Sequence, residues 1–111
     1  MQTDDIFKSV KASITVCDTE GKVIYMNDAS QAVFGDMVGK SMIPCHQQRS
    51  QDIIRRLMEQ EETHAYTIQK GEVRKLIYQT PWYKEGEPAG LVELSLVLPE
   101  EMPHYVREAK K

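Results

Sequence analysis

The sequence predicts one domain of the α+β class, with a five-stranded antiparallel sheet and helices packed on one face. Three observations predict it: two adjacent strand-like runs near the N-terminus, three more near the C-terminus, and helical patterning between them. Because a sheet of two or three strands is marginally stable alone, we expect both groups of strands to share one sheet. The length of 111 residues also fits a single domain.

The N-terminal strand pair is expected at residues 13–17 and 22–26, where β-branched and aromatic residues are frequent. A polar turn separates the two runs, and its Gly21 accepts the positive φ that tight turns require. Asn27 then caps a short helix. Apolar residues within positions 1–12 predict a lead-in helix before the first strand.

The longest helix is expected from Pro44 to about Glu62, because proline suits the first turn of a helix. Its apolar stripe recurs at helical spacing, so we expect that side of the helix to face the sheet. The stripe comprises Ile53, Ile54, Leu57 and Met58.

Short turns join the three C-terminal strands into an antiparallel meander. These strands are expected at residues 63–70, 73–83 and 89–98. Pro81 marks a bulge or an edge, because proline lacks the backbone N–H that a central strand uses. The core domain thus spans residues 13–98, and residues 99–111 are expected to form a short C-terminal helix or tail.

Charge and composition argue against several classes of function. The formal net charge is −3 and the basic residues are scattered, which argues against binding nucleic acid by charge. No apolar stretch is long enough to cross a bilayer, and the acidic N-terminus carries no secretory signal. Cys17 and Cys45 make no disulfide framework, so we expect a cytoplasmic protein.

Several short motifs follow one another along the chain. They are Asp18-x-x-Gly21-Lys22-Val23-Ile24-Tyr25-x-Asn27, then Phe34-Gly35, then Val38-Gly39-Lys40. In order and spacing they resemble the PAS domain family over roughly residues 14–98. A closer resemblance is to the PAS modules of DUF438-type bacterial and archaeal proteins. It rests on Cys45-His46-x-x-x-Ser50 and on Gly90-Leu91-Val92-Glu93-Leu94-Ser95.

The resemblance implies a sheet in the order 2-1-5-4-3, with helices enclosing a pocket on one face. It also implies sensing, ligand binding or dimerisation rather than catalysis. One departure lies after the last strand, where Leu98-Pro99 stands in place of the Asp-Ile-Thr that commonly leads into a signalling helix. Proline donates no backbone hydrogen bond and restricts the residue before it, which argues against the usual output coupling.

His46 is the main candidate for chemistry, because it shares one helix face with residues 50, 53 and 57. At the start of a helix the dipole disfavours a charged imidazole, and a neutral one ligates a metal or hydrogen-bonds a ligand. Haem-binding PAS sensors use a histidine on this helix, so the resemblance implies haem as a candidate cofactor. The favoured alternative is a core histidine bonded to a backbone carbonyl or to Glu93.

Cys45 lies at the same helix start, a location that raises thiol reactivity. The favoured alternative is a small buried apolar residue. An enzyme that uses Cys45, His46 and Glu93 together is disfavoured, because adjacent residues on a helix project about 100° apart.

Glu93 interrupts an otherwise apolar strand, and strand alternation leaves two placements for it. On the helix-covered face it needs a partner, His46 or Tyr78, because a buried lone carboxylate is costly. On the opposite face it is solvated, and this placement is slightly favoured. The candidate ligand-binding residues are His46, Cys45, Ser50, Ile53, Ile54, Leu57, Tyr78 and Glu93.

We therefore expect a non-catalytic sensory or regulatory module in signal transduction, which binds a small ligand, mediates protein–protein dimerisation, or does both. One sheet face is left open, which suits a homodimer in which Ile6, Phe7 and Val10 of the lead-in helix cover the partner's sheet. A signalling protein is a second expected partner; nucleic acid and membrane are not. The alternative function is a haem- or metal-binding redox or gas sensor that uses His46.

Overall fold

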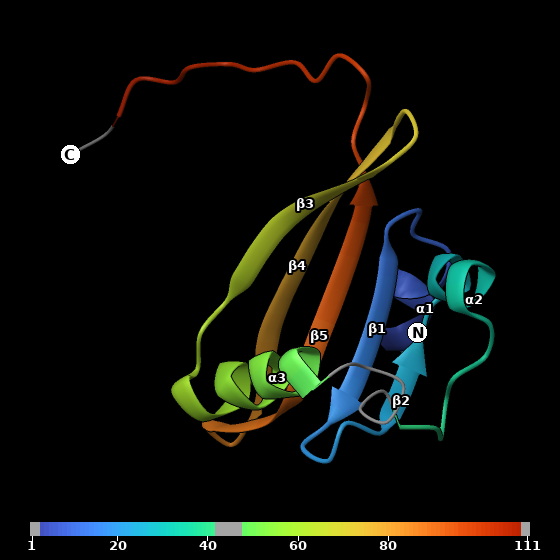
Figure 1. The fold of residues 1–111 in the computed structure, drawn as a ribbon, viewed down its shortest axis with the longest axis vertical. Coiled ribbons are helices and arrows are strands. Elements are labelled where there is room, and N and C mark those ends of the chain that lie inside the picture. Colours follow the sequence, from blue (N-terminus) through green and yellow to red (C-terminus); the bar gives the residue numbers. More distant parts are fainter. Residues whose placement is uncertain (1–2, 42–47, 110–111) are drawn as a thin grey trace.

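The computed structural model describes residues 3–41 and 48–109, which form one five-stranded sheet in the order β2-β1-β5-β4-β3 (Figure 1). Every neighbouring pair of strands is antiparallel. The strands are β1 (Ser13–Asp18), β2 (Val23–Met26), β3 (His64–Lys70), β4 (Val73–Lys84) and β5 (Glu87–Val97). The predicted α+β class and the strand order 2-1-5-4-3 are confirmed.

Helices pack at two places on this sheet. They are α1 (Thr3–Lys8), α2 (Asp28–Phe34) and α3 (Gln48–Gln60). Figure 1 shows α3 crossing β4 and β5 near one end of the sheet, while α2 lies beside β1 and β2. The lead-in helix is thus present, and the expected start of the longest helix at Pro44 lies outside the described residues.

The two faces of the sheet are told apart by the register, because directly opposed residues on neighbouring strands point the same way. Cys17 lies opposite Leu91, and both pack with Leu57 of α3, so their side is the helix face. Two residues along the same ladder, Thr15 lies opposite Glu93. Glu93 is therefore on the helix face, and its favoured placement on the solvated back of the sheet is wrong.

The opposite side, the back face, carries apolar side chains that remain half-buried or exposed. They are Ile14, Val16, Leu76, Tyr78, Val92, Leu94 and Leu96. The buried apolar residues of the described chain are few, namely Cys17, Val23, Met26, Leu57, Ile77 and Leu91. Much of the apolar surface of this domain therefore stays accessible on the back face.

Asn27 ties the N-terminal segment to the sheet and to α2, and its side chain is only 1% exposed. Its Oδ1 accepts the backbone N–H of Ile14 at 3.0 Å and that of Ser30 at 3.1 Å, which caps α2 as predicted. Its Nδ2 donates to the backbone carbonyls of Phe7, Val10 and Ala12, at 3.1, 3.3 and 2.8 Å. One buried amide thus fixes where α1, β1 and α2 meet.

Gly90 lies on β5 between Asp18 of β1 and Trp82 of β4 in the register. Its φ is +150°, and a Cβ there would overlap the carbonyl oxygen of Cys17. That same oxygen accepts a hydrogen bond from Nε1 of Trp82 at 2.9 Å. The missing side chain therefore lets the indole reach over β5 to the backbone of β1.

The described tail, residues 99–109, contains no helix, so the helix expected after Pro99 is absent there. Pro103 supplies a reason, because proline lacks the N–H that a helix uses and restricts Met102 before it. Figure 1 shows the tail extending away from the sheet. Consistently, the radius of gyration of 15.4 Å exceeds the value of about 13 Å for a compact domain of this length.

Candidate functional site

A row of polar side chains crosses the helix face of the sheet from strand to strand. It consists of Thr15 on β1, Glu93 on β5, Gln79 on β4 and His64 on β3. Each member lies directly opposite the next in the register, so all of them point to the same side. We call these four residues the polar row; Thr15 is buried and the other three are half-buried.

Hydrogen bonds connect three members of the polar row. Nε2 of Gln79 donates to Oε2 of Glu93 at 2.9 Å, and Oε1 of Gln79 lies 3.3 Å from Nδ1 of His64. Because Gln79 presents its oxygen to the imidazole, Nδ1 must carry a proton to complete this pair. The network thus assigns His64 as the donor end of the row and the Glu93 carboxylate as its acceptor end.

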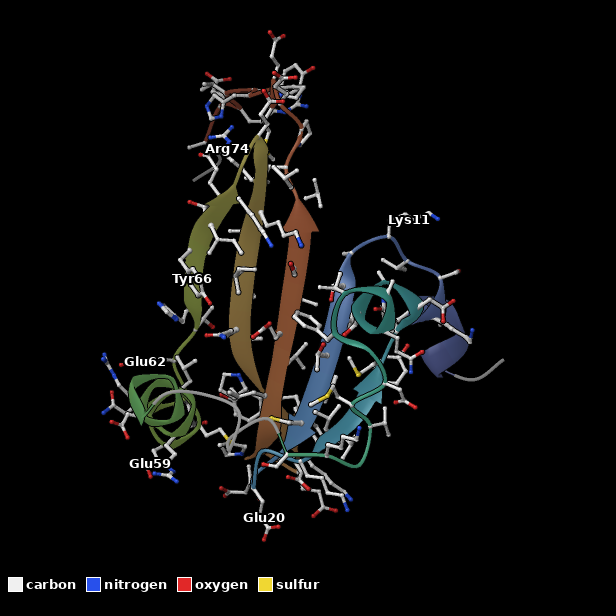
Figure 2. All side chains as sticks on the ribbon, turned by 45° about the vertical axis from the view of Figure 1, so that its right-hand side comes forward. Lys11, Glu20, Glu59, Glu62, Tyr66 and Arg74 are labelled. Carbon is white, nitrogen blue, oxygen red and sulfur yellow. The ribbon has the colours of Figure 1, made fainter. Side chains whose placement is uncertain are left out.

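Aromatic and hydroxyl groups flank the row. Tyr66 follows His64 on the same side of β3, with 4.8 Å between the ring centroids. Burial raises the pKa of the Tyr66 hydroxyl, and the nearby negative charge of Glu93 raises it further. At the other end of the row, the hydroxyls of Thr15 and Ser30 are hydrogen-bonded, which joins β1 to α2. Figure 2 shows Tyr66 along β3, between Glu62, which follows α3, and Arg74 near the β3–β4 hairpin.

Cys17 lies on the helix face where α3 packs, and it is only 1% exposed. Burial raises the pKa of its thiol most strongly, and the charges of Asp18 and Glu93 add to the rise, against a hydrogen bond with the backbone of Leu91 that lowers it. The thiol is therefore held protonated at neutral pH. Because the thiolate is the nucleophilic form, Cys17 is a packing residue rather than a reactive one.

The structure brings together only part of the predicted ligand-binding set. Glu93 and Leu57 both lie on the helix face, where Leu57 is buried against Cys17 and Leu91. Tyr78 does not join them: it lies opposite Leu94 on the back face and is 37% exposed. The protein partner of Glu93 on this face is Gln79 rather than Tyr78.

The remaining predicted residues belong to the segment before and within α3. Ser50, Ile53 and Ile54 are part of that helix, which packs over β4 and β5, and their side chains are not described. Cys45 and His46 lie outside the described residues. Within the described part of the chain, no group of three or more metal-ligating side chains comes together.

His64 and Gln79 were missed by the sequence-based prediction, although the sequence holds a signal for them. The turn at Gly71-Glu72 sets Lys70 opposite Val73, and counting back along both strands then pairs His64 with Gln79. In the second hairpin a register shift lies between Trp82 and Tyr83. Counting back from its turn alone would set Gln79 opposite Val92, and the shift moves Gln79 opposite Glu93. Polar residues that lie opposite one another therefore predict a transverse row once both the turns and the register shift are known.

The PAS fold family matches residues 7–101, and the chain therefore belongs to the PAS family. PAS domains are sensory domains typical of signalling proteins, and they are usually non-catalytic. Among curated proteins, no sequence matches this chain. The helices of the described ranges are too short or too polar to traverse a bilayer.

Solved structures share this fold at low sequence identity. The PAS domain of histidine kinase ThkA superposes with a TM-score of 0.62 at 14% identity, covering 77% of this chain and 98% of that one. The VqmA dimer of Vibrio cholerae, solved in the absence of target DNA, gives 0.69 at 18% identity, covering 100% of this chain and 59% of VqmA. VqmA bound to DPO gives 0.67 at 17% identity, covering 85% and 56%. At these identities the likeness shows the fold alone.

Proposed function

We propose that this PAS domain senses a small polar ligand bound on the helix face of its sheet, at the polar row. The observation that carries the proposal is the placement of Glu93, a half-buried carboxylate in an otherwise apolar strand, held in position by Gln79. Removing a carboxylate from water is costly unless it is hydrogen-bonded. A chain that keeps such a group, oriented by a second polar residue, is suited to recognise a ligand there.

Two further features support a sensory rather than a catalytic role. The only described cysteine, Cys17, is buried with a raised thiol pKa, which removes it as a nucleophile. VqmA, which shares the fold, has been solved bound to a small molecule, DPO. The proposal retains the resemblance to DUF438-type PAS modules, in which Cys45 and His46 are further candidate ligand-binding residues.

The back face supports a second part of the proposal, a symmetric homodimer. Its seven apolar side chains lie on neighbouring strands and stay half-buried or exposed. Contiguous apolar patches on a protein surface often mark interaction sites. In α1 and the turn after it, Ile6, Phe7 and Val10 are 51%, 44% and 40% exposed, so they are free to pack against a partner. We expect the back face of one chain to be covered by a second copy, and the assembly to work in the cytoplasm.

The ligand site is tested by a fragment screen observed by nuclear magnetic resonance. The side-chain amide of Gln79 is a local reporter, since its Nε2 bonds Glu93 on the helix face, and its signal is assigned from the Gln79→Glu variant. We expect at least one small polar fragment to shift this signal. Tyr78→Phe changes the adjacent back-face residue and should leave binding unaltered. If every fragment that binds leaves the Gln79 signal in place, the site is elsewhere and the proposal fails.

A further inference from the structure

We infer that the polar row selects small aromatic amines, with the Glu93 carboxylate receiving the protonated nitrogen of the ligand. This inference rests on the proposed function and specifies the chemistry of the same site. It follows from which hydrogen-bonding positions the row has already used, from the charge on this face, and from the side chains beside it.

The first argument is the direction of the hydrogen bonds within the row. Oε1 of Gln79 accepts a hydrogen bond from His64, and one N–H of its Nε2 donates to Glu93. An ionised carboxylate is an acceptor only, with room for about four hydrogen bonds. Toward the described side chains, Glu93 therefore keeps most of its accepting capacity, because the one hydrogen bond it accepts there is at Oε2. With its proton on Nδ1, a neutral His64 also presents Nε2 as an acceptor. A ligand that satisfies these positions must bring donors.

The second argument is charge. Among the described residues no ion pair involves Glu93; the ion pairs there are Lys8 with Asp28 and Arg56 with Glu62. Lys75 is the nearest described lysine along β4 on this face, and its Cα is four residues, about 13 Å, from that of Gln79. The negative charge also reaches its neighbours, because it raises the pKa of both Tyr66 and Cys17. A cationic ligand would offset this unpaired charge.

The third argument is the apolar surface that adjoins the row. Ile77 is next to Gln79 on the same side of β4 and is 6% exposed, and it lies opposite Tyr66. Tyr66 as a residue is 37% exposed, so it is open to packing by a second ring. Aromatic rings stack or pack edge to face with such a neighbour. A ligand that places an aromatic ring beside Tyr66 and a cationic nitrogen at Glu93 would therefore satisfy both requirements.

The test compares three probes with the same ring: 2-phenylethylamine, phenylacetate and 2-phenylethanol, which are cationic, anionic and neutral at pH 7. Each is titrated into the full chain while the Gln79 side-chain amide signal is followed. We expect the amine to bind about tenfold or more tightly than phenylacetate, since hydrogen bonds to charged groups are the strong ones.

Two variants locate the effect at the carboxylate. Glu93→Gln keeps the shape of the side chain and removes its charge, and we expect it to weaken amine binding about tenfold. The same variant should weaken 2-phenylethanol binding much less than amine binding, because the hydroxyl carries no charge. Glu87→Gln, at the exposed start of β5, removes the same charge away from the row and should change neither probe.

Phenylacetate binding at Gln79 as tightly as the amine overturns the inference, as does a Glu93→Gln variant that retains amine binding. So does the failure of the amine to shift the Gln79 signal. In each of these cases the ligand-sensing proposal stands if another fragment shifts that signal, and it falls as well if none does.

Discussion

Asn27 shows how one residue determines local architecture. A buried side-chain amide has both an acceptor and a donor end, and here each end bonds backbone groups of a different element. The acceptor end serves β1 and α2, and the donor end serves Phe7 of α1 and the segment that follows this helix. An unpaired backbone polar group in such a buried place is costly, which explains why the junction depends on this amide.

Replacing this residue gives the first prediction. Asn27→Ala leaves at least two buried backbone groups without a partner, so we expect a loss of about 2–4 kcal/mol in the free energy of unfolding. Urea unfolding followed by circular dichroism measures it. Asn27→Asp keeps the acceptor oxygens but sets a carboxylate against three carbonyls, so it should also destabilise, more at pH 7 than at pH 4. Wild-type stability in Asn27→Ala would contradict this account.

Glu93 influences two titrating groups, which gives a prediction about pH. The pKa values of Cys17 and Tyr66 are raised from their ordinary 9.0 and 10.0, burial being the larger cause and Glu93 a further one in both. Well below pH 9 both groups are protonated in the folded and the unfolded chain. As pH rises further, the unfolded chain releases these protons first, so the free energy of unfolding should fall.

Glu93→Gln removes one cause of both shifts, so the fall in stability from pH 8 to pH 10.5 should be shallower in that variant. Urea unfolding at several pH values measures the two slopes. Glu87→Gln serves as the charge-matched control, because residue 87 is exposed at the far end of β5. Identical slopes in wild type and Glu93→Gln would show that the carboxylate does not reach these groups.

At the scale of elements, β5 is the strand on which the others depend. It pairs with β1 on one side and β4 on the other, so it joins the N-terminal strand pair to the C-terminal meander. At Gly90 this junction leaves no room for a side chain, because Trp82 of β4 reaches over it to bond the carbonyl of Cys17 in β1. The helix face and the polar row both require this union of the two strand groups.

Gly90→Ala tests the junction. The added Cβ overlaps backbone rather than a flexible side chain, and φ of +150° is strained for alanine. We expect a loss of more than about 3 kcal/mol in the free energy of unfolding, beyond the usual effect of a single substitution. Gly86→Ala, in the turn after β4, has a positive φ but open space around its Cα, so it isolates the cost of φ alone. Equal losses in the two variants would mean that the close approach is unimportant.

At the scale of the whole molecule, the domain has a small buried core and an apolar back face. Small domains are only marginally stabilised by the apolar surface that they bury on folding. Apolar surface that stays in water adds nothing to the free energy of unfolding. A second copy placed on the back face would bury part of that surface. Symmetric pairs of this kind are the commonest form of assembly among soluble proteins.

A charge placed at the centre of the back face should prevent this pairing. Leu94 lies between Ile14 and Tyr78 in the register, so Leu94→Lys is the change of choice. We expect a dimer for wild type and a monomer for the variant by light scattering, with a folded circular dichroism spectrum in both. Glu87→Lys adds the same side chain outside the back face and should remain a dimer. A monomeric wild type at high concentration would exclude the homodimer.

The strands and their turns could be predicted because they depend on local patterns, whereas the strand order in the sheet was implied by the resemblance to the PAS family. Turn residues such as Gly21 and Gly71 mark where strands reverse, and both have positive φ in the structure. The cap at Asn27 was likewise predicted from its side chain alone. The tail was mispredicted because its acidic and basic residues favour a helix while Pro103 opposes one.

The face on which Glu93 lies could not be decided from the sequence. Alternation divides β5 into two sets of residues, and both contain apolar side chains, so hydrophobicity does not identify the set that α3 covers. That decision belongs to packing, because Leu57 meets Leu91 and Cys17 and thereby carries Glu93 to the helix face. The hydrogen-bond partner of Glu93, Gln79, likewise follows from the register between β4 and β5. By itself the sequence determined most of the helices and strands and their order along the chain. The tertiary structure decided which side chains meet, because a contact depends on the positions of both residues.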